Sequence, residues 1–252
     1  MLKAVLFDLD DTLIDWSAVD LDWETRDSEM LGRVSSYIGD KVQPISDFKG
    51  LVKDYRQRTF SAWEDGRSSL RAPHMGRILV EALVAAGVPE NHVDEIEALT
   101  AFDWGAIPGI TLFPDVPEVL ELLLANHIRI GIVTNAHQPM WLRDKELEDF
   151  DLLKYFEDCR FSAADVGYLK PHPRIFEAAL DCIGSKPEET VFVGDSPVAD
   201  VAGAQGAGIK AVLRVRKTMS PMLSGLIVPD HTVSSLAELP AILDRWYPGW
   251  RS

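Results

Sequence analysis

The chain has 252 residues, of which 46% are hydrophobic and 26% are charged. This composition is typical of globular proteins with a buried core, and it excludes a chain that is disordered throughout. Forty acidic residues against 25 basic ones give a formal net charge of −15, which opposes binding to a nucleic-acid polymer or to an anionic membrane surface. A small anionic substrate remains compatible, because a metal ion or a lysine sets the local charge of a site.

The cysteine content and the hydropathy pattern indicate the compartment. Cys159 and Cys182 are the two cysteines, too few for a disulfide framework and without the spacing of a zinc site, which suits a reducing compartment. No stretch approaches the roughly 20 apolar residues of a membrane span, and the first predicted strand follows Met1 without a separate signal-peptide segment. We therefore expect a cytoplasmic protein without membrane contact, either a monomer or a homodimer.

Short continuous apolar runs predict strands that are buried on both faces of a parallel sheet. The first run is residues 4–7, Ala-Val-Leu-Phe. Similar runs follow at residues 128–133, 190–193 and 209–213. Segments with helical periodicity, such as 116–124 and 174–183, precede the later runs. This alternation predicts an α/β fold with a doubly wound parallel sheet, in which ligands bind at the carboxyl ends of the strands.

The pattern between residues 16 and 104 is helical and contains no comparable strand run. The helical segments are residues 21–38, 45–63, 71–86 and 92–102. Residues 104–109, with two glycines and a proline, predict a hinge that returns the chain to the sheet. We therefore predict a core formed by residues 1–15 and 105–252, interrupted by an all-helical insertion at residues 16–104. A last helix is expected from residue 235 to residue 243.

The first polar cluster stands at the end of the first predicted strand. Residues 8–12 read Asp-Leu-Asp-Asp-Thr, and extended geometry would point Asp8 and Asp10 to the same side. Two such carboxylates can act as nucleophile and general acid, particularly around a divalent cation that offsets their repulsion. By itself the motif fits an acidic strand-to-loop turn equally well, with Asp11 or Thr12 as a capping residue.

Two further polar positions follow in chain order. Thr134 and Asn135 come after the run at 128–133, where a hydroxyl and backbone N–H groups can hold phosphoryl oxygens, although both residue types are also ordinary in loops and caps. Lys170 precedes a predicted helix and can neutralise charge on Asp8 and on a phosphoryl group. The alternative for this residue is a solvated surface lysine.

The last polar cluster follows the strand predicted at 190–193. Asp195 stands where a carboxylate can complete a magnesium site of oxygen ligands, and Asp200 can orient its waters or Lys170. Helix capping by Asp195 or Ser196 is the alternative, and it is compatible with the first reading. Polar residues thus follow several of the predicted strands.

The order and type of these motifs resemble the haloacid dehalogenase superfamily across nearly the whole chain. The pattern is Asp-x-Asp-x-Thr, then threonine at a strand end, then lysine, then Gly-Asp with a further aspartate five residues on. The helical insertion is similar to that family's helical cap of the C1 type. The resemblance implies a Rossmann-like core with an inserted all-helical cap domain.

The same resemblance implies roles for the acidic residues. Asp8 would attack the phosphorus and become an aspartyl phosphate, while Asp10 would protonate the leaving alcohol and later deprotonate the attacking water. Mg²⁺ would be bound by a carboxylate oxygen of Asp8, the backbone carbonyl of Asp10 and a carboxylate oxygen of Asp195. The implied cofactor is therefore Mg²⁺.

The resemblance also implies which residues surround the phosphoryl group. Thr134 and Lys170 would hold its oxygens, and Asn135 would contribute its backbone N–H. Thr12 and Asp200 would support these groups from a second layer. The expected function is a magnesium-dependent phosphatase that hydrolyses a small phosphate monoester.

Three alternatives share this fold. The dehalogenases that gave the superfamily its name lack a carboxylic acid two positions after the nucleophile and need no magnesium, so Asp10 and Asp195 favour phosphate chemistry. A phosphomutase has the same core motifs, but it needs a cap that excludes water and rebinds an intermediate. A non-catalytic protein that binds a phosphate ligand would be expected to lack Asp8, Asp10, Lys170 or Asp195, and all four are present.

Among the phosphatases, the sequence resembles the group of pyrimidine nucleotidases and N-acylneuraminate phosphatases, with phosphoglycolate phosphatase as a neighbour. The similarity is carried by residues 134–135, 170–171 and 232–239. Ala136 departs from it, since the group commonly has glycine there. We expect residues 63–68 to form a turn between two cap helices, where Arg67 either contacts the substrate or is solvated. The identity of the substrate stays open.

Overall fold

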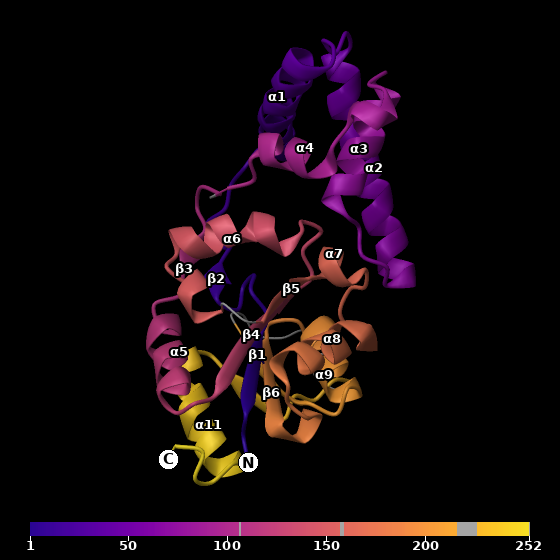
Figure 1. Ribbon diagram of the computed structural model, residues 1–252. Coiled ribbons are helices and arrows are strands. Elements are labelled where there is room, and N and C mark those ends of the chain that lie inside the picture. Colours follow the sequence, from indigo (N-terminus) through magenta and orange to yellow (C-terminus); the bar gives the residue numbers. More distant parts are fainter. Residues whose placement is uncertain (106, 157–158, 216–225, 252) are drawn as a thin grey trace.

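The computed structural model describes residues 1–105, 107–156, 159–215 and 226–251, in which a six-stranded parallel sheet carries helices on both faces (Figure 1). In spatial order the strands are β5 (Arg160–Ser162), β4 (Arg129–Thr134), β1 (Ala4–Phe7), β6 (Thr190–Gly194), β7 (Lys210–Arg214) and β8 (His231–Val233). The predicted doubly wound parallel sheet is confirmed. The predicted core range 105–252 and the hinge 104–109 each include residues outside the described ranges.

The four apolar runs predicted as strands form β1, β4, β6 and β7, the middle of the sheet. The edge strands β5 and β8 were not predicted, because three residues are too few to show a pattern. Helices complete the core: α5 (Val116–Ala125), α6 (Met140–Asp149), α7 (Ala163–Val166), α8 (Pro173–Ile183), α9 (Gly203–Gly206) and α11 (Leu239–Trp246). Short turns of other helical types are η1 (Glu90–His92), η2 (Leu153–Tyr155), η3 (Pro187–Glu189), η4 (Pro197–Ala202) and η5 (Leu236–Glu238).

Alternate residues of β1 enter two separate hydrophobic clusters, one on each face of the sheet. Val5 and Phe7 pack in the cluster that includes residues of α5 and α11, whereas Ala4 and Leu6 pack in the cluster that includes residues of α8 and α9. All four side chains are fully buried. Because both faces of β1 are covered, its end can hold polar side chains in a largely water-excluded setting.

Four helices form a separate group beyond the carboxyl ends of the strands (Figure 1). They are α1 (Trp23–Lys41), α2 (Phe48–Ser69), α3 (Met75–Ala85) and α4 (Glu95–Phe102). Three of them begin at an aspartate, Asp22, Asp47 or Asp94, whose side chain accepts a hydrogen bond from a backbone N–H of the first turn. We keep the predicted division, with residues 16–104 as cap and the remainder as core, as a proposal.

The two linkers between this helical group and the sheet run side by side. The short strands β2 (Ile14–Asp15) and β3 (Thr111–Leu112) pair in antiparallel fashion, with Ile14 opposite Leu112. Asp11 takes a positive φ of 59° just before β2 and turns the chain away from the sheet. The chain therefore leaves and re-enters the core at one place.

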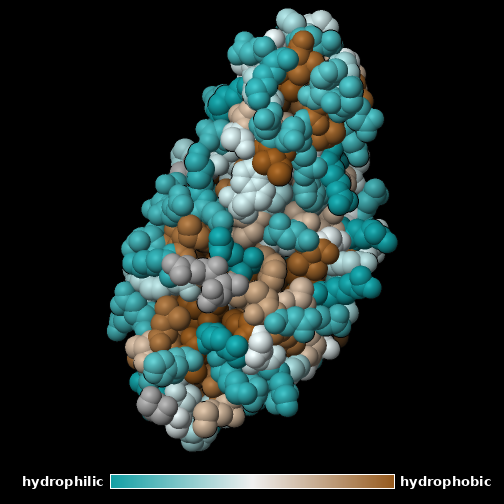
Figure 2. Space-filling view, viewed as in Figure 1, coloured by the Kyte–Doolittle hydropathy of each residue, from teal (hydrophilic) through white to brown (hydrophobic). Residues whose placement is uncertain are grey.

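Hydrophilic side chains cover most of the face shown in Figure 2, and apolar side chains reach that face in separate patches on the helical group and on the core. This agrees with the excess of acidic residues. Among the described residues, we find no helix with the length and apolar character needed to cross a membrane.

The first prediction concerns Gly131 in the centre of β4. An added Cβ would lie 2.9 Å from Leu6 Cδ2 and 3.0 Å from the carbonyl oxygen of Cys159. We expect Gly131→Ala to lower the free energy of unfolding by about 1–3 kcal/mol, because backbone and core must shift apart. Gly206→Ala is the control, since nothing lies within 4 Å of its added Cβ. Urea denaturation measures both, and equal stabilities would contradict this packing.

Candidate active site

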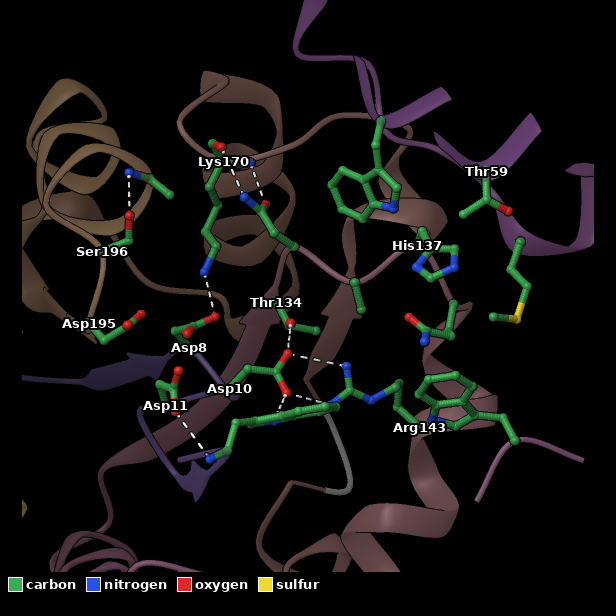
Figure 3. Close-up of a pocket in the computed structure, with 18 of the residues that line it drawn as sticks. Asp8, Asp10, Asp11, Thr59, Thr134, His137, Arg143, Lys170, Asp195 and Ser196 are labelled. Atoms are coloured by element: carbon green, nitrogen blue, oxygen red, sulfur yellow. Dashed lines mark hydrogen bonds and ion pairs between the residues drawn. The ribbon is translucent and has the colours of Figure 1, made fainter. Parts of the chain in front are cut away.

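The strand order brings three of the sequence motifs to one edge of the sheet. β1 lies between β4 and β6, so Asp8, Thr134 and Asp195 stand at or just after the ends of neighbouring strands. The backbone N–H of Asp8 donates to the carbonyl of Val193 at 2.9 Å, which continues the β1–β6 ladder as far as Asp8. Residues more than 180 positions apart in sequence therefore line one cavity of about 570 Å³ (Figure 3).

Lys170 lies between two buried carboxylates. Its Nζ is 2.7 Å from Asp8 Oδ1 and 2.7 Å from Asp200 Oδ1. Burial alone would lower the pKa of Lys170, but the carboxylates of Asp200 and Asp8 outweigh it and hold the pKa above its usual value. The alternative of a solvated surface lysine is wrong for this residue, which is 4% exposed.

The loop that carries Lys170 is fixed by Asn135. The side-chain oxygen of Asn135 accepts the backbone N–H of Lys170 at 2.7 Å, and its amide donates to the Lys170 carbonyl at 3.1 Å. This pair of bonds links the end of β4 to the loop before α8. Asn135 therefore positions Lys170 through its side chain, a contact that the sequence did not predict.

Asp8 is held on both carboxylate oxygens. Lys170 contacts Oδ1, and the hydroxyl of the fully buried Thr12 donates to Oδ2 at 3.3 Å. Burial raises the pKa of Asp8 well above its usual range, and the carboxylates of Asp200, Asp10 and Asp195 add to this effect, while Lys170 opposes it. A further cation beside Asp8 would favour the ionised, nucleophilic form.

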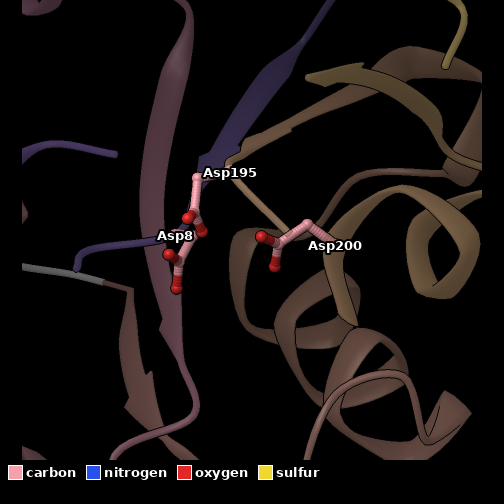
Figure 4. A group of neighbouring side chains, drawn as sticks. All are labelled: Asp8, Asp195 and Asp200. Atoms are coloured by element: carbon pink, nitrogen blue, oxygen red, sulfur yellow. The ribbon is translucent and has the colours of Figure 1, made fainter. Parts of the chain in front are cut away.

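Three carboxylates form a group that fits a divalent cation. Oxygens of Asp8, Asp195 and Asp200 lie within 4.8 Å of one another (Figure 4). Burial and the nearby carboxylates of Asp200 and Asp11 raise the pKa of Asp195 to about 6, which reflects negative charge that a cation would offset. A set of carboxylate oxygens suits Mg²⁺. Asp200 accepts from Lys170 and from the Ser196 backbone N–H at 2.8 Å, and Asp8 accepts from Lys170 and Thr12, so both are held in place by donors of the protein.

The side chain of Asp10 points away from Asp195 and toward Arg143 (Figure 3). It accepts from the Trp16 indole N–H at 2.8 Å and from the Thr134 hydroxyl at 3.2 Å. Arg143 donates to both of its oxygens, at 2.7 and 3.2 Å. Burial alone would raise the pKa of Asp10, but Arg143 and the hydrogen bonds outweigh it and lower the pKa. The carboxylate of Asp10 is thus fixed by several donors at once.

Arg143, Glu146 and Trp104 are the part of the site that the sequence did not indicate. Arg143 lies in α6, is 2% exposed, and pairs with both Asp10 and the fully buried Glu146. The Trp104 indole donates to Glu146 at 3.2 Å. These residues belong to no recognised motif, and α6 is so rich in charge that its pattern does not mark the buried ones.

The opposite wall of the cavity comes mainly from the helical group and is aromatic. Trp23 of α1, Tyr55 and Trp63 of α2, and Met75 of α3 line it. His137 packs edge-on against Trp63, with ring centroids 5.7 Å apart. Burial, with the positive charge of Arg143 nearby, lowers the pKa of His137 to about 4, so its imidazole is neutral near pH 7.

The prediction of a turn at residues 63–68, from which Arg67 could contact the substrate, is wrong. Residues 63–68 lie within α2 and form no turn. The Arg67 side chain is 73% exposed, pairs with Glu64, and is absent from the cavity lining. The helix continues because residues 63–68 include no proline and end near the left-handed cap at Leu70. We therefore assign Arg67 no role in substrate binding.

Comparisons with known proteins agree with this geometry. The family model of haloacid dehalogenase-like hydrolases matches residues 2–208. The chain is 27% identical over 242 residues to N-acylneuraminate-9-phosphatase of Rattus norvegicus, which covers 96% of this chain and 94% of the relative. It is 31% identical over 220 residues to phosphoglycolate phosphatase of Salmonella typhi, which covers 84% and 80% respectively.

A solved structure of 2-haloacid dehalogenase from Pseudomonas syringae pv. Tomato DC3000 is similar over 98% of this chain and 100% of that one, with a TM-score of 0.62 and 27% identity. The fold is therefore shared by proteins named for two different reactions. The side chains at the cavity must distinguish between them.

The second prediction tests the buried lysine. We expect Lys170→Met to lower the free energy of unfolding by about 3–5 kcal/mol at pH 7 in EDTA, because it leaves two buried carboxylates without their cation. Lys186→Met, at an exposed position, should change it by less than about 0.5 kcal/mol. Chemical denaturation followed by circular dichroism measures both variants. A Lys170→Met protein as stable as the control would refute the pairing.

Proposed function

The chain belongs to the haloacid dehalogenase-like hydrolase family, and we propose that it is a magnesium-dependent phosphatase that hydrolyses a small phosphate monoester through an aspartyl phosphate. The observation that carries this proposal is the arrangement around Asp8. The nucleophile, the cation Lys170 and the metal-ligand candidate Asp195 meet at one edge of the sheet, and the acid candidate Asp10 lines the same cavity.

In the first half of the reaction, a carboxylate oxygen of Asp8 attacks the phosphorus, and the bond from phosphorus to the alcohol oxygen breaks. Asp10 gives the departing oxygen a proton. Lys170 neutralises charge on the phosphoryl oxygens, and Thr134 and the backbone of Asn135 orient them. The contact of Lys170 with Asp8 and that of Thr134 with Asp10 support these roles.

In the second half, water attacks the phosphorus of the aspartyl phosphate, and its proton passes to Asp10. The bond between phosphorus and Asp8 breaks, which releases inorganic phosphate and restores the carboxylate. Mg²⁺ would be held by Asp8, Asp195 and the backbone carbonyl of Asp10, and it supplies charge neutralisation for the phosphoryl group. Asp200 keeps Lys170 in place beside Asp8.

A dehalogenase is the second candidate because of the structural similarity to 2-haloacid dehalogenase. Two features favour the phosphatase. Asp10 places a second carboxylate in the cavity, which displacement of a halide does not require, since halide leaves without a proton. Asp195 adds to a carboxylate group that fits a divalent cation. Relatives named as phosphatases align over most of the chain.

The charged groups that line the cavity indicate which kind of leaving group it can accept. Of the described residues that line it, two are cationic, Lys170 and Arg143; Lys170 is already paired with Asp8 and Arg143 with Asp10 and the buried Glu146. His137 is neutral near pH 7 because its pKa is about 4, and Asp27 on the cap side is acidic and paired with Arg56. We therefore propose a leaving group without a carboxylate of its own.

The aromatic wall supports a flat or apolar leaving group. Trp23, Tyr55 and Trp63 offer ring faces and edges to whatever alcohol is bound at Asp8. Phosphoglycolate and N-acylneuraminate 9-phosphate, the substrates in the relatives' names, both carry a carboxylate. A charged group of that kind would be desolvated in this cavity without a counter-ion.

The third prediction tests the nucleophile. Asp8→Asn should reduce Mg²⁺-dependent release of phosphate from p-nitrophenyl phosphate by at least about 1,000-fold, because the amide cannot form the aspartyl phosphate. Asp181→Asn, at an exposed position, is the control. Rapid acid quench with labelled substrate should trap label on the wild type and not on Asp8→Asn. Phosphate release retained by Asp8→Asn, or halide release from 2-chloropropionate without Mg²⁺, would contradict the proposal.

The fourth prediction tests the leaving group. A nucleoside 5′-monophosphate or an aryl phosphate should exceed phosphoglycolate in kcat/KM by about 10-fold or more, which corresponds to one unpaired buried charge. A panel with Mg²⁺ that detects both inorganic phosphate and isomerised ester measures this. Isomerised ester in place of free phosphate would indicate a phosphomutase. A preference for the carboxylated ester would overturn the proposed leaving group.

A further inference from the structure

Three charged groups form a chain that begins in the cavity lining with Asp10, whose side chain is 34% exposed, and ends at a buried glutamate. Asp10 accepts from Arg143 at 2.7 and 3.2 Å, and Arg143 in turn pairs with Glu146 on the same helix. Arg143 and Glu146 are 2% and 0% exposed. A guanidinium that donates to both oxygens of a carboxylate fixes its plane as well as its position, which a lysine ammonium cannot do.

Each end of this chain is bound to one linker of the cap. Trp16 directly follows β2 on the outgoing linker and donates its indole N–H to Asp10 at 2.8 Å. Trp104 directly follows Asp103 at the end of α4, on the returning linker, and donates its indole N–H to Glu146 at 3.2 Å. Trp16 also stacks on Trp23 of α1, with ring centroids 6.5 Å apart. The acid position is thus connected to both passages between sheet and cap.

We propose that Arg143 is a positioning residue that fixes the carboxylate of Asp10, and that Trp16 and Trp104 connect this orientation to the two cap linkers. The inference rests on the proposed phosphatase function, since it gives Asp10 a reaction to serve. Arg143 acts through Asp10: both of its pairing partners are carboxylates of the protein, and it is engaged on both. It is therefore distinct from a residue that binds the substrate.

This role has a kinetic signature. Loss of Arg143 releases Asp10 from its orientation, which affects proton transfer and leaves binding of the phosphoryl group to Lys170 unchanged. We expect Arg143→Met to lower kcat by about 10- to 100-fold, the order of loss for a reacting group displaced by about 1 Å, with KM changed by less than about 3-fold. Guanidinium ion should restore part of kcat in Arg143→Met and leave the wild type unaffected.

A double-mutant cycle separates this role from general support of the fold. In an Asp10→Asn background, Arg143→Met should reduce kcat no further, because the group that it positions is already lost. p-Nitrophenyl phosphate is the substrate, since its good leaving group keeps the Asp10→Asn enzyme measurable. Trp16→Phe and Trp104→Phe remove the indole donor and keep an aromatic ring, and their smaller losses in kcat should also vanish in that background.

Arg160→Met is the matched control. Arg160 makes the same two-pronged contact with a carboxylate of α6, Asp144, at 2.6 and 2.8 Å, and neither residue lines the cavity. Its kcat should match the wild type once the protein is folded. An equal fall in kcat for Arg160→Met would mean that α6 needs its ion pairs for stability alone.

The outcomes distinguish the inference from the function on which it rests. The test applies if the wild type releases phosphate and Asp8→Asn does not. Then a kcat that Arg143→Met leaves unchanged overturns the positioning role. The role is also overturned if Arg143→Met lowers kcat by the same factor in the Asp10→Asn background as in the wild type. A rise confined to KM would make Arg143 a substrate contact and also overturn it. If the wild type releases no phosphate, the proposed function fails instead. A crystal structure of Arg143→Met then decides the inference, which requires the Asp10 carboxylate to have left its present orientation.

Discussion

The site depends on the way in which buried negative charge is compensated at the end of β1. Asp8 and Asp200 share one ammonium, that of Lys170, at 2.7 Å each, while a carboxylate oxygen of Asp195 lies within 4.8 Å of theirs. Such a concentration of carboxylates is tolerated only if each charge has a partner or a metal ion to offset it. The two covered faces of β1 make this compensation strong, because they keep water from screening it.

The second pairing, between Asp10 and Arg143, separates Asp10 from the other acidic residues of the site, so that the two sets lie in different electrostatic environments. Asp8 and Asp195 belong to the carboxylate group that fits a divalent cation, and Asp10 turns toward α6. Opposite environments push the pKa values of Asp8 and Asp10 in opposite directions, Asp8 upward mainly through burial and Asp10 downward through Arg143 and its hydrogen bonds. A nucleophile must be ionised and a general acid protonated, so the proposed roles require a cation beside Asp8 that lowers its pKa, and a bound phosphate ester whose negative charge raises the pKa of Asp10.

The connection between core and cap also follows from local contacts. The linkers pair as β2 and β3, and each carries a tryptophan whose indole N–H donates to the network around Asp10. The cap contributes aromatic side chains to the wall that faces Asp8. The acidic residues of the cavity thus stand at strand ends, whereas much of its aromatic lining comes from the helices, which can vary without disturbing the sheet.

The sequence by itself determined the central strands and the main cap helices, since a buried strand shows a continuous apolar run and an amphipathic helix shows its period. It also predicted which carboxylates and which lysine belong to the site, because Asp8, Lys170 and Asp195 belong to a recognisable order of motifs. Only the tertiary structure decided what those motifs contact. The pairing of Asp10 with Arg143 joins residues 133 positions apart, and the exposure of Arg67 follows from the uninterrupted course of α2. Local sequence predicts neither the pairing nor the exposure, because the burial of an arginine is decided only when the helix that carries it packs against the rest of the protein.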